Sequence, residues 1–202
     1  MRRWTPLVIP QQDVEVTDIN LAQLRIEFAR STLGEADVAA SPVEQFDRWF
    51  KEAMQSQLRE PYAMTLATAD ANGQPSLRVM MMRDYSERGI SFFTNYLSRK
   101  GRELTENPQA SLLFFWSELE RQVRISGKVS KVSAEESSAY FSQRPVSSQV
   151  GAWASEQSQV IADRGVLETR EARFAAEFGE AVPRPPHWGG FCVSLEEVEF
   201  WQ

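Results

Sequence analysis

The strongest constraint on the fold is a series of short apolar segments after residue 60, each of a length that suits a β-strand. Within Arg121–Val132, for example, Val123, Ile125 and Val129 fall on one face of an extended chain and polar residues on the other. Turn signals such as Asp70-Ala71-Asn72-Gly73 separate the segments. The pattern predicts strands at Tyr62–Ala69, Ser76–Tyr85, Ile90–Thr94, Gln109–Ser117 and Arg121–Val132, and around Phe191–Leu195 and Val198–Trp201.

Helical signals interrupt this series. Ser41-Pro42-Val43-Glu44 and Ser133-Ala134-Glu135-Glu136 both place a capping serine three residues before a glutamate. Further helices are expected after Asp18, at Ser98–Glu106 and over Ala162–Phe178. These short strands with hairpin-type turns and flanking helices predict a mainly β fold with α, a small antiparallel barrel. We expect residues 1–17 to form a flexible arm and 18–202 a single domain.

Composition excludes several classes of function. The chain has 202 residues with one histidine, His187, and one cysteine, Cys192, which argues against a zinc site or a Cys/His nucleophile pair, so no metal is expected. A net charge of −6 argues against nucleic-acid binding, and no apolar run is long enough to span a membrane. A lone cysteine cannot form an internal disulfide and fits the cytoplasm. The chemistry is therefore expected to belong to a bound cofactor.

Two groups of basic residues are candidates for binding an anion. Arg78 lies within an otherwise apolar strand, and a buried arginine needs an anionic partner, whether a ligand or a carboxylate in a structural ion pair. Ser98-Arg99-Lys100 opens a helix, where free N–H groups and two cations could hold a phosphate or could simply face water. Gln122 lies on the polar face of its strand and could contact a heterocycle edge or solvent.

The segment from Tyr140 to Ser158 concentrates hydrogen-bond donors. Tyr140 and Arg144 are four residues apart on one helix face, and Ser148 follows Pro145 at an expected new helix start. Hydroxyl, guanidinium and free amide donors are the groups that a phosphate dianion requires. A capped, partly exposed helical corner would explain the serines but not this concentration of donors.

These segments, in this order, resemble the pyridoxamine 5′-phosphate oxidase family of FMN-binding split barrels, from about Leu24 to Gln202. The motifs that carry the resemblance are Arg78–Arg83, Phe92-Phe93-Thr94-Asn95, Ser98-Arg99-Lys100, Leu119–Val123, Tyr140-Phe141 with Arg144-Pro145, Ser148–Trp153, Glu156-Gln157-Ser158 and Glu199–Gln202. The resemblance implies an antiparallel, Greek-key type, split β-barrel with flanking helices, FMN as cofactor, and a homodimer with its sites at the interface.

The resemblance also implies the residues of two sites. The FMN contacts would be Arg78, Val79, Met80, Met81, Met82, Arg83, Phe93, Thr94, Arg99, Lys100, Gln122, Gln157, Ser158 and Trp201. The substrate phosphate would meet Arg83, Tyr140, Arg144 and Ser148. The implied reaction, part of vitamin B6 metabolism, moves a hydride from pyridoxamine or pyridoxine 5′-phosphate to the flavin. Dioxygen then reoxidises the flavin, giving peroxide and pyridoxal 5′-phosphate.

Three departures from the family pattern bear on these expectations. Arg83 stands where the family usually has lysine, and Phe28 stands where a tyrosine is usual. The sequence ends at Gln202, before the family's Arg-Leu-His-Asp-Arg segment, which supplies arginine and histidine to the substrate, so no catalytic residue is assigned. An omitted tail is the expected reason, and His187, which precedes the last strands, is expected to be structural.

Two alternative functions remain open. The first is a superfamily oxidase that acts on another ring substrate, of the phenazine-pathway type. The second is a shortened, non-catalytic protein that binds FMN or pyridoxal phosphate. Retention of Tyr140, Arg144 and Ser148 favours a phosphorylated substrate over the first alternative.

Overall fold

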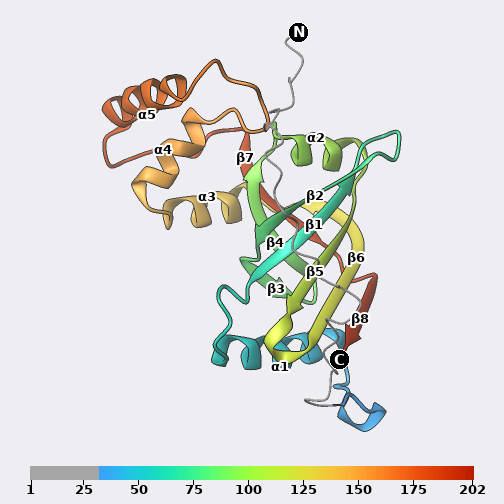
Figure 1. The fold of residues 1–202 in the computed structure, drawn as a ribbon. Helices are drawn as coiled ribbons and strands as arrows, with labels where there is room; N and C mark the ends of the chain where they lie inside the picture. Colours follow the sequence, from blue (N-terminus) through green and yellow to red (C-terminus); the bar gives the residue numbers. More distant parts are fainter. Residues whose placement is uncertain (1–31) are drawn as a thin grey trace, which may run out of the picture.

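The computed structural model describes residues 32–202, so the expected N-terminal arm, the helix after Asp18 and Phe28 lie outside the described residues. The described chain forms one curled antiparallel sheet with helices at its ends (Figure 1). Its strands are β1 (Ala63–Ala69), β2 (Pro75–Met81), β3 (Asp84–Ser86), β4 (Gly89–Asn95), β5 (Gln109–Trp116), β6 (Arg121–Lys131), β7 (Trp188–Val193) and β8 (Glu197–Trp201). The mainly β prediction with flanking helices is confirmed.

The sheet is ordered β2-β1-β5-β6-β7-β4-β3, and β8 pairs with the first half of β6. β6 is long enough to serve two neighbours in succession, because Gln122–Ser126 pair with β8 and Val129–Lys131 pair with β7. The two strands at the ends of this order, β2 and β3, are consecutive in the chain. The sheet therefore curls until its first and last strands approach each other.

The prediction of a single strand at Ser76–Tyr85 is wrong, because this segment forms two strands, β2 and β3. The backbone changes partners in the middle of this segment. The N–H of Met82 still donates to Tyr62 O on the β1 side (2.9 Å), whereas the N–H of Arg83 donates to Ser91 O on β4 (2.8 Å). The apolar run Val79–Met82 continues up to this point, so the sequence pattern gives no sign of the break.

The helices begin close to the predicted positions. They are α1 (Pro42–Gln55), α2 (Arg99–Glu106), α3 (Ala134–Ser142), α4 (Val146–Ala154) and α5 (Gly165–Phe178). The Ser41 hydroxyl accepts from the Glu44 N–H at 3.1 Å, and Ser133 and Glu136 form the reciprocal capping box that their spacing predicts. Among the described residues, no helix combines the length and the apolar character needed to cross a membrane.

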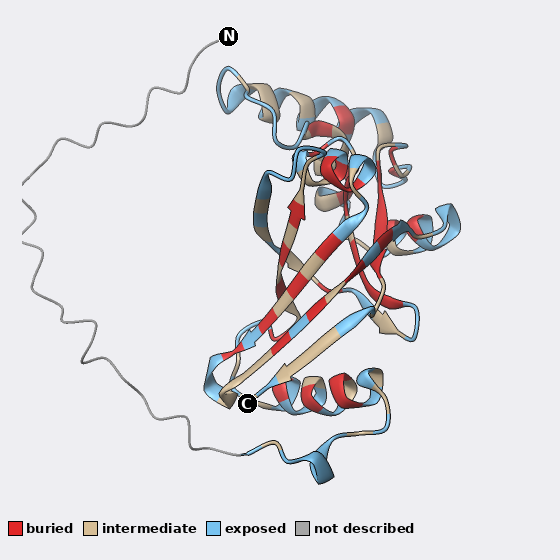
Figure 2. Ribbon diagram, turned by 90° about the vertical axis from the view of Figure 1, so that its right-hand side faces the viewer, coloured by how far each residue is buried: buried red, intermediate tan, exposed pale blue. Residues whose placement is uncertain are grey.

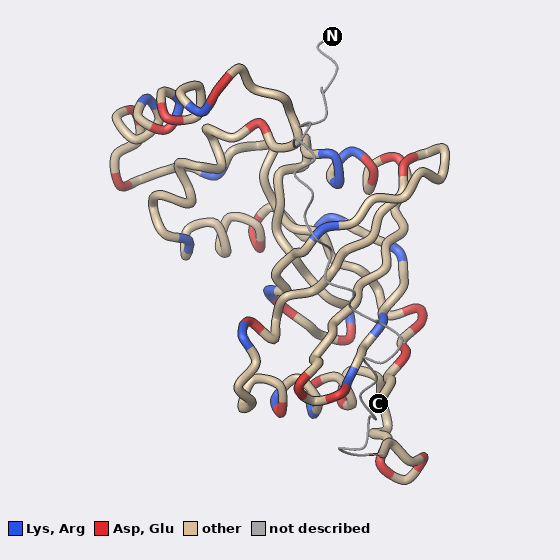
Figure 3. Tube along the Cα trace, viewed as in Figure 1, with Lys and Arg blue, Asp and Glu red and all other residues tan. Residues whose placement is uncertain are grey.

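Two hydrophobic clusters pack the helices against the curled sheet, which is called the barrel below. The inner faces of the strands and of α1 are buried (Figure 2). In the larger cluster, Phe46 and Trp49 of α1 pack against barrel residues such as Phe114 (ring centroids of Phe46 and Phe114 5.1 Å apart). The smaller cluster joins α3, α4 and α5, which together are called the helical layer, to β7 through Phe141, Phe174 and Trp188. Basic and acidic residues are interspersed along the sheet and the helices (Figure 3).

Leu112 of β5 tests the larger cluster, because its side chain is 0% exposed. Leu112→Ala should lower the free energy of unfolding by roughly 2–5 kcal/mol through lost burial and a residual cavity. Leu97→Ala, at a leucine that is 61% exposed, should change it by less than about 0.5 kcal/mol. Urea denaturation at constant m-value measures both, and equal losses in the two variants would contradict this account of the core.

Candidate functional site

A cavity of about 260 Å³ opens between the barrel and the helical layer. It is framed by β2 and the bend that follows it, by β4, by the first turn of α2, by the end of α3 and by the start of β7. Its lining residues are Val79, Met80, Met81, Arg83, Phe93, Thr94, Lys100, Tyr140, Arg144, Gln157 and Trp188. All of these except Trp188 are among the residues expected from the sequence to contact a cofactor or substrate.

Two guanidinium groups face this cavity. Arg83 lies over the rings of Tyr62 (5.8 Å) and Tyr140 (5.9 Å), and Arg144 lies 4.7 Å from the centre of the Trp188 ring. None of the ion pairs between described residues involves either arginine. The aromatic faces thus hold both cations in place without neutralising them.

Arg144 is short of hydrogen-bond partners within the described chain. Its Nη1 atom is buried and has no acceptor. Burial lowers the pKa of the Arg144 guanidinium, the Tyr140 side chain opposes this, and the charge of Arg83 lowers it further. A buried donor that lacks an acceptor is costly, so an anion bridging Arg83 and Arg144 would relieve both the missing hydrogen bond and the repulsion between the two cations.

Stacked aromatic rings fix the geometry beside this arginine pair. The Phe93 ring stacks on Tyr140 with centroids 4.1 Å apart and an interplanar angle of 19°, and on Trp188 at 5.5 Å and 12°. Trp188 belongs to the smaller hydrophobic cluster and is only 5% exposed. The Tyr140 hydroxyl is therefore carried on a ring whose orientation is set by packing.

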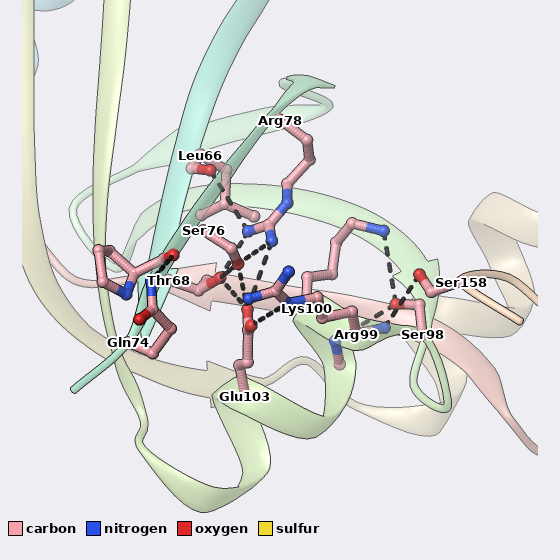
Figure 4. A network of polar contacts seen from close by, with 12 residues as sticks. Leu66, Thr68, Gln74, Ser76, Arg78, Ser98, Arg99, Lys100, Glu103 and Ser158 are labelled. Carbon is pink, nitrogen blue, oxygen red and sulfur yellow. Dashed lines mark hydrogen bonds and ion pairs between the residues drawn. The ribbon is translucent and has the colours of Figure 1, made fainter. Parts of the chain in front are cut away.

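A second group of cations lies at the start of α2, where the Lys100 ammonium also lines the cavity (Figure 4). Ser98 caps the helix by accepting from the Gly101 N–H at 3.3 Å. A Cβ at Gly101 would lie 2.2 Å from Tyr96 O, so only glycine lets the first turn approach the end of β4 so closely. The Arg99 N–H donates to Ser158 Oγ at 3.1 Å, which brings the segment after α4 onto the helix start.

Lys100 has only long contacts to neutral acceptors among the described residues. Its Nζ lies 3.3 Å from Thr94 Oγ1, 3.4 Å from Ser98 Oγ and 3.4 Å from Gln157 Oε1. Burial lowers the pKa of Lys100 and the charge of Arg78 lowers it further, while Glu103 opposes both. A half-buried ammonium of this kind gains from an anionic ligand.

Arg78 has the anionic partner that was expected from the sequence, and this partner is a carboxylate of the chain itself. Its guanidinium lies 3.3 Å from Glu103 Oε2 and donates to Thr68 Oγ1 and Ser76 Oγ, both at 2.5 Å. β2 is not fully buried, because Leu77 and Val79 on its outer face are 72% and 64% exposed. The structural ion pair that was one of the two interpretations of Arg78 is thus present, at the edge of the Lys100 site.

The remaining expected site residues do not line the cavity. The Met82 side chain is buried in the larger cluster. Ser148 lies in the first turn of α4, where its N–H donates to Pro145 O. Gln122 and Trp201 are cross-strand neighbours on β6 and β8, at the end of the sheet that packs on α1 (Figure 1). His187, expected to be structural, lies against Trp153 with Nε2 3.2 Å from Ala152 O.

Sequence reasoning missed two residues, Trp188 and Glu103. Trp188 enters the cavity because it pairs with Asn95 across β7 and β4, a long-range register that no local pattern reveals. Glu103 lies four residues after Arg99, a spacing typical of a helical ion pair, and this signal was present in the sequence. Its burial was not predictable from the spacing alone.

The two cationic groups suit a cofactor and a substrate that each carry a phosphate. The Lys100 group combines an ammonium, a helix start and a serine hydroxyl, and the Arg83–Arg144 pair supplies two guanidinium groups beside stacked rings. FMN is compatible with these donors, since it would place its phosphate at the first group and its ring in the cavity between the two.

Comparison with known proteins agrees with this geometry. The family model described as pyridoxamine 5′-phosphate oxidase matches residues 50–201. Pyridoxine/pyridoxamine 5′-phosphate oxidase of Paraburkholderia phymatum is 59% identical over 182 residues, covering 90% of this chain and 86% of that protein. The protein of the same name from Burkholderia multivorans is 58% identical, with 90% and 85% covered.

Two solved structures are similar in fold. PhzG from Burkholderia lata, in complex with tetrahydrophenazine-1-carboxylic acid, has a TM-score of 0.80, 36% identity and coverage of 85% of each chain. An FMN-binding protein from Nostoc punctiforme, related to pyridoxamine 5′-phosphate oxidase, has a TM-score of 0.63 at 16% identity, covering 81% of this chain and 86% of that one. The latter supports the fold alone, and the split-barrel prediction is confirmed. From the family model and these relatives, the chain belongs to the pyridoxamine 5′-phosphate oxidase family, a family of oxidases.

Proposed function

We propose that the protein is an FMN-dependent oxidase that converts pyridoxamine 5′-phosphate or pyridoxine 5′-phosphate to pyridoxal 5′-phosphate in the cytoplasm, with dioxygen as electron acceptor and hydrogen peroxide as product. The observation that carries the proposal is the pair of guanidinium groups, Arg83 and Arg144, that face one cavity without a carboxylate partner in the described chain. A phosphate dianion is the ligand that two such arginines and a tyrosine hydroxyl bind best.

The chain's own residues would bind and orient the reactants. Lys100, Thr94, Gln157 and Ser158 would hold the FMN phosphate, and bound FMN would supply the capacity to accept a hydride. Arg83 and Arg144 would hold the substrate phosphate, with Tyr140 beside them. Two fixed phosphates would set the distance between the substrate ring and the flavin ring, which lowers the entropic part of the barrier.

We also propose a homodimer whose sites lie at the interface. Gln122 and Trp201 are adjacent on β6 and β8 but do not line the cavity of their own chain, so a second copy would have to bring them to the flavin. Large apolar side chains are exposed on the outer face of the sheet, including Leu77 (72%) and Phe115 (61%). A cavity of about 260 Å³ is also small for FMN plus a substrate, as expected of half a site.

A second candidate function follows from the similarity to PhzG, whose structure holds a tetrahydrophenazine carboxylic acid. Such a ligand carries a single carboxylate in place of a phosphate dianion. One arginine of the Arg83–Arg144 pair would satisfy a carboxylate, so the presence of both favours the phosphorylated substrate.

The first test is spectroscopic. The purified protein, loaded with FMN, should show flavin absorption bands that bleach when pyridoxine 5′-phosphate is added without oxygen and return when air is admitted. Bleaching by a reduced phenazine carboxylic acid alone would support the second candidate. Bands that neither compound bleaches would indicate a protein that binds flavin without oxidising either substrate. Failure to bind FMN at all would overturn the proposal.

Arg144→Met tests the assignment of the substrate phosphate. Removing one charged hydrogen-bond donor should raise KM for pyridoxine 5′-phosphate by about thirtyfold, equivalent to about 2 kcal/mol. The dissociation constant of FMN should not change, because Arg144 lies outside the Lys100 group. Arg164→Met, at an arginine whose side chain is 89% exposed, is the matched control and should leave KM unaltered. An unchanged KM in Arg144→Met would place the phosphate elsewhere.

Analytical ultracentrifugation tests the dimer. The wild-type chain should sediment at twice its 23.0 kDa mass, and Leu77→Lys should shift it toward the monomer by burying a charge in an apolar contact. Val160→Lys, at a valine that is 79% exposed and lies on the loop before α5, is the control and should remain dimeric. A monomeric wild-type protein that still binds FMN with full affinity would argue against shared sites.

A further inference from the structure

The buried carboxylate of Glu103 connects the basic residues at the start of α2 to those of β2 (Figure 4). Glu103 is 4% exposed and lies on the inner side of α2. Its Oε1 accepts from Arg99 Nε at 2.7 Å, and its Oε2 lies 3.3 Å from Arg78 Nη2. One carboxylate thus holds two guanidinium groups that come from different elements.

Two hydroxyl groups complete the arrangement. Thr68 of β1 and Ser76 of β2 donate to Glu103 Oε2 at 2.5 and 2.6 Å and also accept from Arg78. Burial raises the pKa of Glu103, but the hydrogen bonds from Ser76, Thr68 and Arg99 and the charge of Arg78 outweigh burial and lower the pKa to about 2. Glu103 therefore stays ionised at any pH at which the protein would work.

The charges of the cluster match a phosphate monoester. Arg78, Arg99 and Lys100 carry three positive charges and Glu103 carries one negative charge, which leaves a net charge of two positive charges. A phosphate monoester carries close to two negative charges at neutral pH. The Lys100 ammonium, which has no ion pair among the described residues, lies beside the segment that contains Gln157 and Ser158 (Figure 4).

We propose that Glu103 is a positioning residue of the FMN phosphate site: it holds the Arg78 side chain from β2 beside the Arg99 side chain from the start of α2. These two arginines and Lys100 then meet the phosphate in one preformed arrangement. This inference rests on the proposed FMN function. Glu103 touches no ligand in this role and acts through the two arginines. Without it, two guanidinium groups and an ammonium would repel one another and would have to be ordered when the ligand binds.

Glu103→Gln is the direct test, because it keeps the shape and removes the charge. The single amide oxygen can accept from only one of the two arginines, and the amide N–H groups oppose the other. The measured quantity is the ratio of the dissociation constants of riboflavin and FMN for the apoprotein, determined by flavin fluorescence quenching. Riboflavin lacks the phosphate, so this ratio isolates the phosphate site from the ring site.

We expect Glu103→Gln to lower the ratio by about tenfold or more, with riboflavin affinity changed by less than about twofold. Glu106→Gln is the matched control, since Glu106 is an exposed glutamate of the same helix, and it should leave the ratio unchanged. Glu103→Asp keeps the charge but withdraws the carboxylate by one methylene group. It should lower the ratio of the two dissociation constants nearly as much as Glu103→Gln does. This variant keeps the test valid if Glu103→Gln does not fold.

Each contrary result has a separate meaning. An unchanged ratio in Glu103→Gln and Glu103→Asp would overturn the positioning role and leave the FMN function intact. A raised ratio in Glu103→Gln would also overturn it, because it would show that Glu103 only repels the phosphate. A wild-type protein that binds FMN no better than riboflavin would refute the phosphate site itself, and with it the proposed function.

Discussion

The change of hydrogen-bonding partner at Met82 and Arg83 is the constraint on which the site depends. Up to Met82 the backbone is bonded on the β1 side, and from Arg83 it is bonded to β4, so one continuous segment contributes to both ends of the sheet order. The curled sheet and the position of Arg83 at the cavity follow from this single crossing. Arg78 lies on β2 before this bend and Arg83 lies after it, so the bend separates the Arg78 network from the Arg83–Arg144 pair.

The two cationic groups offset the repulsion between their positive charges in different ways. The cluster at α2 contains an internal carboxylate, Glu103, which joins Arg78 to Arg99. The pair of Arg83 and Arg144 has no carboxylate in the described chain and is held by aromatic faces instead. A group with its own counterion is rigid before a ligand arrives, whereas a group without one gains more when an anion enters. The first arrangement suits a retained cofactor, and the second suits a substrate that must come and go.

Much of this structure was predictable from local pattern, and the rest depends on distant contacts. Short apolar segments bounded by turn signals located β1, β4, β5 and β6, and the spacing of serine and glutamate located the starts of α1 and α3. The break between β2 and β3 was missed because the apolar run Val79–Met82 continues up to it. The candidate residues of the cavity came mainly from the family resemblance, since Arg144 or Gln157 alone carries little information. Trp188 could not have been placed without the register between β7 and β4.

Trp188 has a consequence for the energetics of the whole helical layer. The same residue belongs to the buried cluster that contains Phe141, Val150 and Phe174, and it also lines the cavity. A molecule that fills the cavity therefore contacts a side chain that packs α3, α4 and α5 against the barrel. Ligand binding and the packing of these helices are thus thermodynamically linked. A bound ligand suppresses local opening of the helical layer, and a change that favours local opening lowers the affinity for the ligand.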